Sequence, residues 1–329
     1  MNAQATGAAG ESNLALAARV FAWCNLGVLA AFLVNNFLNS AYGWPGAALT
    51  TATTSGLAWL QFAFYVLAIA IGAAFVMTNR DVTLRRDAGR ITAINTYFIR
   101  AAFWMVVIVG VADATISFLR IEGLMAQIVG GALDGDLGRA HFRGFYVHLP
   151  LIGLAFVVAA FTRSLGFIWL GLLIVVAELL IVISRFVFSY EQAFMADLVR
   201  FWYAALFLFA SAYTLIEEGH VRVDVFYAGF ANKTKGMVNA LGSLFLGVVL
   251  CWTILLVGMG AKTSIINAPV FNFEVTQSSF GMYVKYLMAA FLGIFAISMM
   301  IEFCGYMLSA IADWREEPGH VDHEASQIS

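Results

Sequence analysis

The sequence is poor in charge. Charged residues make up 12% of its 329 positions, whereas hydrophobic residues make up 62%. A soluble globular domain carries about 25% charged residues, so this composition excludes an ordinary water-soluble fold and indicates a chain surrounded mainly by lipid. The net charge is -2, and without an excess of basic residues no nucleic-acid partner is expected.

Cysteine, histidine and nucleotide-binding motifs are also scarce. The three cysteines, Cys24, Cys251 and Cys304, lie in apolar segments at no metal-ligand spacing, as buried thiols do. Of the five histidines, only His148 lies near an apolar segment, and it lies at the end, so axial haem ligation is not expected. The sequence has no glycine-rich phosphate loop and no nucleophile elbow. It therefore predicts neither an enzyme nor a bound cofactor or metal.

Eight apolar segments are long enough, or nearly so, to cross a bilayer. The hydrocarbon core requires about 20 apolar residues in helical form, because backbone polar groups must be satisfied inside each segment. We therefore predict an all-α, polytopic integral membrane protein. Its predicted spans are 16–38, 59–77, 98–119, 147–161, 167–188, 198–216, 237–259 and 283–308.

The distribution of arginine predicts the orientation. Loop 78–100 contains five arginines, whereas loop 39–58 contains no charged residue. Cytoplasmic loops hold the excess of Arg and Lys, so we expect loop 78–100 in the cytoplasm and loop 39–58 in the periplasm. With eight spans, both termini are then expected in the cytoplasm. Loop 120–146 is then periplasmic, and its stretch IEGLMAQIVGGALDG is typical of an interfacial helix.

The chain resembles itself weakly at an offset near 139 residues. The sequence GFYVH at 144–148 aligns with GMYVK at 281–285, each at the start of the last span of its half. We therefore predict two parallel four-helix units, the first a degenerate copy. The predicted divisions are an N-terminal membrane unit at 1–146, a core at 147–310 that includes one additional preceding span, and a polar, disordered cytoplasmic tail at 311–329.

Charged residues within predicted spans are candidates for a function, because their burial is costly. Among them are Asp113 in the third span, and Glu178 and Arg185 in the fifth. In a functional interpretation, one of the two carboxylates is a cation or proton site. In a structural interpretation, each pairs with a polar partner across a helix interface, and the candidates are Arg185 and the asparagine amides of the first span. Glu302, near the end of the last span, is expected to reach the interface as an anchor.

Proline is rare as well. The sequence has four prolines, and only Pro150 lies near the inside of a span. The substrate sites of carriers are commonly formed by spans that glycine and proline interrupt. Continuous helices argue against a transport pathway within this chain alone and favour a rigid packing partner.

Polar residues are concentrated at the end of the sixth predicted span. The apolar helix is followed by two glutamates and then by GHVRVDV at 219–225, which includes His220, Arg222 and Asp224. In this membrane context the segment resembles the small membrane subunit of TRAP-type transporters, the tripartite ATP-independent periplasmic solute carriers. The similarity covers about 167–308, so about four helices precede it as an N-terminal extension.

Further positions agree with that family. Glu274 and Ser278 precede Lys285, which opens the last helix. Many members have a Gln-Glu pair before the sixth span; its best counterpart here is Ala196 and Asp197, and the alternative is the nearby Glu191 and Gln192. The resemblance implies that these residues, together with the HVRVD segment, form a structural lock or a subunit interface through charge-assisted hydrogen bonds. The alternative is that the HVRVD segment only caps its own helix.

The resemblance implies a scaffold in the bacterial inner (cytoplasmic) membrane. It would brace a large TRAP membrane subunit, which carries an organic acid in symport with sodium after a periplasmic substrate-binding protein has delivered it. No cofactor is implied. Two alternatives remain at this stage: a membrane subunit of a redox complex, and a self-sufficient carrier.

Overall fold

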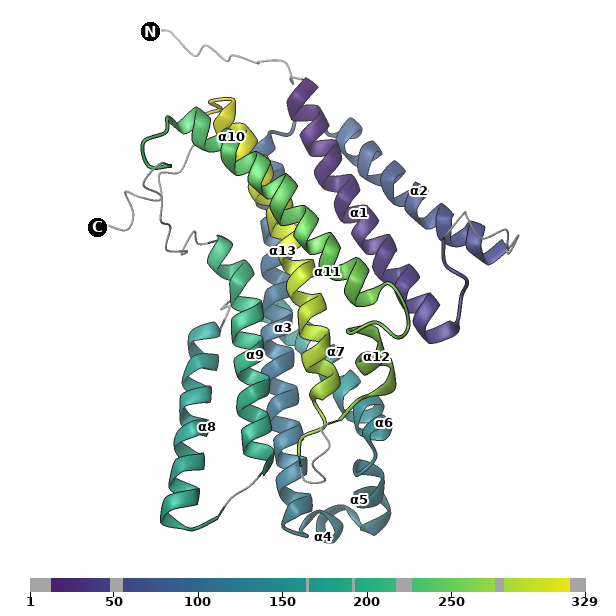
Figure 1. Ribbon diagram of the computed structural model, residues 1–329, viewed down its shortest axis with the longest axis vertical. Helices are drawn as coiled ribbons and strands as arrows, with labels where there is room; N and C mark the ends of the chain where they lie inside the picture. The colour runs from purple at the N-terminus through teal and green to yellow at the C-terminus, as the bar shows by residue number, and fades with distance from the viewer. Residues whose placement is uncertain are drawn as a thin grey trace. The chain divides into compact units, whose positions relative to one another are not determined.

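The regular secondary structure is entirely helical in the computed structural model, which describes residues 13–47, 56–163, 166–190, 193–216, 227–275 and 281–319 (Figure 1). Eight helical segments in this part of the chain are long and apolar enough to cross a membrane, which confirms the predicted fold class. The elements are α1 (Asn13–Tyr42), α2 (Gly56–Thr78), α3 (Leu84–Ile121), α4 (Met125–Val129), α5 (Gly131–Leu137), α6 (Ala140–Phe142), η1 (Arg143–His148), α7 (Leu149–Phe161), α8 (Phe167–Val187), α9 (Ala193–Ile216), α10 (Asn232–Gly242), η2 (Ser243–Val248), α11 (Val249–Met259), α12 (Asn267–Asn272) and α13 (Lys285–Trp314).

Several predicted boundaries were wrong. The third span begins at Leu84 instead of at 98, so most of the predicted loop 78–100 is helix, with Leu84, Ala88 and Ile91 buried. The fourth and seventh spans also begin earlier, at Ala140 and Asn232. In each case an amphipathic or polar helical segment precedes the apolar run, and hydropathy alone does not detect it. The predicted interfacial helix is two short helices, α4 and α5, separated by Gly130, which has a positive φ of 85°.

The chain forms two compact units that alternate along the sequence. Unit 1 comprises Met1–Thr92, Val221–Leu250 and Met300–Ser329, and unit 2 comprises Ala93–His220 and Cys251–Met299. This division reflects spatial contacts. It does not test the predicted divisions at 146 and 310 or the duplication, which stay predictions.

In unit 1, α1 and α2 lie side by side (Figure 1). Two glycines allow the close approach: a Cβ on Gly27 would lie 2.9 Å from the Ala68 carbonyl oxygen, and one on Gly72 would lie 2.9 Å from the Cys24 nitrogen. Small residues at such positions are the usual means of close helix packing in membranes, where apolar burial contributes little.

Polar side chains connect the helices of unit 1. Arg19 on α1 pairs with Asp87 on α3 at 2.8 Å, and the Asn25 amide donates to the sulfurs of Met300 and Cys304 on α13. The Thr92 hydroxyl donates to Glu302, which is 4% exposed, so the prediction that Glu302 is an interfacial anchor was wrong.

The polar end of the chain also contacts α3. Arg85 pairs with Asp313 at 2.7 Å and donates to the carbonyl oxygens of Glu317 and Pro318. The predicted tail boundary at 311 lies inside α13, which continues to Trp314.

The packing of α10 against α13 in unit 1 yields a stability prediction. A Cβ on Gly236 would lie 2.5 Å from the Trp314 nitrogen and 2.7 Å from the Ala310 carbonyl oxygen. Because both are backbone atoms, Gly236→Ala should separate the two helices and lower the free energy of unfolding by about 1–3 kcal/mol, as overpacking does. Gly242→Ala, in the same helix with open space at the Cβ, should instead be neutral or gain up to about 1 kcal/mol of helix propensity. Thermal unfolding of both variants in detergent tests this; equal effects would contradict the packing argument.

Candidate functional site

Asp113 on α3 is the centre of a buried polar cluster in unit 2. Its side chain is 0% exposed. Oδ1 accepts from Nη1 of Arg143 at 2.8 Å and lies 3.0 Å from Nε2 of His148, and Oδ2 accepts from the backbone N–H of Tyr283 at 2.7 Å. We call Asp113, Ser117, Arg143, His148, Tyr283 and Tyr286 the Asp113 cluster.

The π-helical turn η1 explains how Arg143 and His148 reach the same carboxylate. In an α-helix, residues five apart point about 140° away from each other, because each residue turns the helix by about 100°. A π-helix closes its hydrogen bonds between residues five apart, so such residues lie on nearly the same face. Arg143 and His148 are the first and last residues of η1, and the wider turn directs both side chains to Asp113.

Only 1% of the Arg143 side chain is exposed, and its Nε and Nη1 groups both have hydrogen-bond partners. Nε donates to the Leu137 carbonyl oxygen at 2.9 Å, Nη1 also lies 3.1 Å from the Ser117 hydroxyl, and the group lies over the Tyr283 ring at 4.0 Å. The Tyr283 hydroxyl donates to the Gly138 carbonyl oxygen at 2.8 Å. Additional hydrogen bonds of this kind help to offset the cost of burying an ion pair.

The hydrogen bonds of His148 define its tautomer. A carboxylate only accepts, so Nε2 donates to Asp113, and in the neutral ring Nδ1 must accept from the Tyr286 hydroxyl, 2.8 Å away. The His148 ring also stacks on Tyr286 with an interplanar angle of 14°. The result is a continuous hydrogen-bonded chain from Tyr286 through His148 to Asp113, which fixes the orientation of all three side chains.

A second carboxylate acts beside the first. Asp197, in the second turn of α9, is 7% exposed and its Oδ2 accepts from the Met282 N–H at 3.1 Å. The carboxylates of Asp113 on α3 and Asp197 on α9 therefore accept hydrogen bonds from two consecutive backbone N–H groups, those of Tyr283 and Met282, just before α13 begins. Negative charge near a helix N-terminus is favourable because it opposes the helix dipole, so this arrangement fixes the start of α13.

The structure describes only some of the other residues predicted to form a structural lock or subunit interface. Lys285 forms an ion pair with Glu274 at 3.1 Å, with the two side chains 49% and 40% exposed, and the Tyr286 N–H donates to the Glu274 carbonyl oxygen. The other four residues of that prediction lie outside the described residues, and their roles stay predictions: His220, Arg222, Asp224 and Ser278.

The two predicted charges of the fifth span lie on α8, and both are exposed. No hydrogen bond or ion pair reaches Glu178 from within the described parts of the chain. Its neighbours one turn away, Val175 and Val182, are 63% and 49% exposed. Glu178 is thus an acid on an outward-facing apolar surface, in contrast to Asp113.

Sequence reasoning missed most of the Asp113 cluster. It considered the amides of α1 as partners for Asp113, but Asn35 donates to the Gln61 carbonyl oxygen, and the actual partners come from a segment assigned partly to a loop. One signal was present: the similar sequences GFYVH and GMYVK contain His148 and Tyr283, and the two segments meet at Asp113.

These features define a class: a polytopic α-helical membrane protein whose interior is held by buried ion pairs. Residues 172–313 match the family model described as tripartite ATP-independent periplasmic transporters, DctQ component. This part of the chain is a DctQ domain, the small permease component of TRAP transporters, and helical segments precede it. No curated protein and no solved structure was found to match the chain.

The match divides the Asp113 cluster between two parts of the sequence. Asp113, Ser117, Arg143 and His148 precede the matched residues, whereas Tyr283 and Tyr286 lie within them. The cluster therefore joins the additional helices to the DctQ domain by hydrogen bonds inside unit 2.

Proposed function

We propose that this chain is the scaffold subunit of a TRAP transporter in the bacterial inner membrane. It braces a large membrane subunit that takes up an organic acid in symport with sodium, after a periplasmic binding protein has delivered the solute. Transport itself is carried out by the partner subunit, and this chain catalyses no reaction. The DctQ domain at 172–313 is the main support for this assignment.

The observation that carries the scaffold role is the exposed acid Glu178 within the apolar surface of α8. A carboxylate facing hydrocarbon costs at least about 2.5 kcal/mol, and Val175 and Val182 beside it give no compensation. A helix of a partner subunit that supplies a hydrogen-bond donor at this depth would remove that cost. We therefore place the large subunit against this face of α8.

The interior of unit 2 suits a brace. In a brace, helices must keep their relative positions while the carrier moves against them. The Asp113 cluster provides bonds from α3 and η1 to the start of α13, and each of its charged groups is paired. Packed polar networks of this kind rigidify the structure around them.

Substitution of Glu178 tests this proposal. Glu178→Leu should leave the isolated chain as stable as before or more stable, because it removes a charge from an apolar face. It should reduce the amount of carrier subunit that co-purifies with the tagged chain by about 3- to 30-fold, the equivalent of a lost interhelical hydrogen bond of about 0.6–2 kcal/mol. Mild-detergent pull-down with mass spectrometry measures the ratio of the two subunits.

Val182→Ala is the matched control, since it alters the same exposed stripe without changing charge, and it should retain most of the carrier. Purification of the unsubstituted chain without any carrier subunit would overturn the scaffold proposal. Equal capture by Glu178→Leu and the unsubstituted chain would place the interface on another face.

A further inference from the structure

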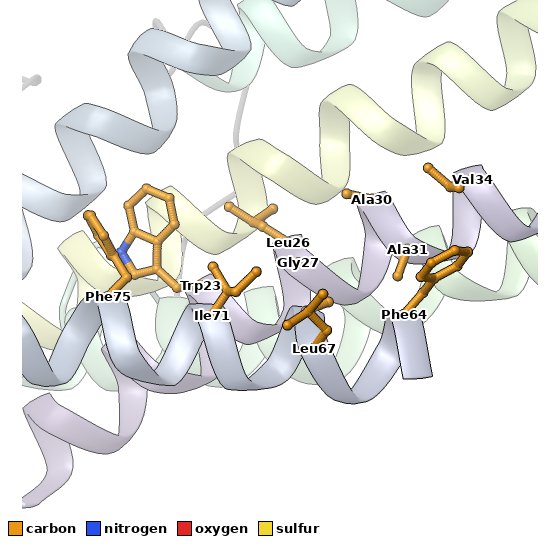
Figure 2. Close-up of a pocket in the computed structure, with 12 residues that line it drawn as sticks. Trp23, Leu26, Gly27, Ala30, Ala31, Val34, Phe64, Leu67, Ile71 and Phe75 are labelled. Carbon is orange, nitrogen blue, oxygen red and sulfur yellow. The ribbon is translucent and has the colours of Figure 1, made fainter. Parts of the chain in front are cut away.

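An apolar groove runs along the α1–α2 pair within unit 1 (Figure 2). Its volume is about 560 Å³, and its lining contains no charged side chain. Ala30 and Val34 on α1, and Leu67 and Ile71 on α2, are exposed in it. Because both helices are candidate spans, the groove lies at the depth of the hydrocarbon core.

The length of the groove corresponds to one leaflet. It extends from Trp23 to Val34 on α1 and from Phe75 to Phe64 on α2, a rise of about 16 Å at 1.5 Å per residue. The hydrocarbon core is about 30 Å thick, so a helix that crosses the bilayer would extend well beyond the groove. A single acyl chain of one leaflet fits this length.

Positive charge is present at one end of the groove. Trp23 and Phe75 lie together at that end (Figure 2), with their ring centroids 4.7 Å apart. The guanidinium carbon of Arg90 lies 6.0 Å from the Phe75 ring centroid, and its side chain is 37% exposed. Arg80, just after the end of α2, is exposed and contacts the Met77 sulfur at 3.2 Å.

The acidic side chains at this end of the groove do not neutralise all of its positive charge. Asp87 accepts from Arg90 at 3.1 Å, but it is also paired with the buried Arg19. Arg86 and Asp81 are exposed nearby in sequence. By contrast, residues 39–58, which include the last residues of α1 and the first residues of α2 at their opposite ends, contain no charged residue.

We propose that this groove binds an anionic phospholipid, with one acyl chain between α1 and α2 and the phosphate at Arg80 and Arg90. The arginine-rich end is the one predicted to be cytoplasmic, and the inner leaflet is the anionic one. The site is formed entirely by the helices that precede the DctQ domain, so the proposal stands independently of the scaffold role.

Native mass spectrometry of the full chain in detergent tests the proposal, with phosphatidylglycerol and phosphatidylcholine of matched acyl chains as probes. The unsubstituted chain should prefer phosphatidylglycerol. Arg80→Gln and Arg90→Gln should each weaken its binding by about five-fold, the effect of roughly one basic residue near an anionic surface, without changing phosphatidylcholine binding. Ala30→Phe, which fills the groove, should weaken both lipids.

Two controls lie outside the groove. Val66→Phe alters an exposed apolar position of α2 that does not line it, and Arg139→Gln removes an exposed arginine of unit 2; neither should alter lipid binding. Equal binding of the two lipids, or no effect of the arginine variants, would overturn the proposal. Photocrosslinking from position 30 in native membranes should label lipid; labelling of a protein chain instead would assign the groove to a partner helix and overturn it as well.

Discussion

Asp113→Asn is expected to lower the free energy of unfolding by about 3–5 kcal/mol, the usual cost of removing one partner from a buried ion pair. Asparagine has nearly the same shape as aspartate, and its carbonyl oxygen can still accept from the Tyr283 N–H. The substitution removes the negative charge, however, and leaves Arg143, 1% exposed, without a counter-ion. The bond to His148 is weakened at the same time, because it loses its charged acceptor. Denaturant or thermal unfolding in detergent measures the loss.

An exposed pair of the same kind provides the control. Asp136 and Arg139 also form an ion pair, but their side chains are 36% and 69% exposed. Asp136→Asn should therefore cost only about 0–1 kcal/mol, as exposed ion pairs do. If both substitutions had equal effects, the Asp113 pair would not be behaving as a buried one.

A double substitution tests whether the loss comes from the unpaired cation. Replacement of both members of a buried pair by apolar groups is often tolerated, so Asp113→Asn with Arg143→Met should be more stable than Asp113→Asn alone. If the double variant instead lost the sum of the unfolding free energies lost by the two single variants, Arg143 would contribute mainly through its contacts with Leu137, Ser117 and Tyr283.

The sequence was sufficient to predict the helical class, because hydrophobic length determines which segments can cross a bilayer. It was insufficient for the ends of those helices. The turn from Leu84 to Arg90 is rich in arginine, and hydropathy assigns it to a loop. In the structure its apolar residues are buried, while Arg85 and Arg90 bond to acids.

Most of the Asp113 cluster could not be predicted for a different reason. The side chains come from α3, η1, the segment before α13 and the first turn of α13, and no local pattern specifies which distant residues meet. The π-turn adds to the difficulty, since helical spacing would place Arg143 and His148 on different faces of an α-helix. The weak internal match drew attention to the two segments that contain His148 and Tyr283, but it did not predict that these segments meet.

The Asp87 cluster of unit 1 should show an order of effects that depends on which partner remains. Asp87 is 0% exposed and accepts from Arg19 at 2.8 Å, from the Trp23 indole at 3.2 Å and from Arg90 at 3.1 Å. Asp87→Asn leaves Arg19 buried without a counter-ion and should cost about 3–5 kcal/mol. Arg19→Met should cost less, because Asp87 keeps the charge of Arg90.

Unfolding of both variants in detergent measures this order. Asp81→Asn is the control, because Asp81 is exposed on the same connection between α2 and α3. Asp81→Asn should be close to neutral. If Arg19→Met were as harmful as Asp87→Asn, the partly exposed Arg90 would contribute little to holding Asp87. Arg19 and Asp87 would then act as an isolated pair between α1 and α3, and the charge of Arg90 would be directed outward.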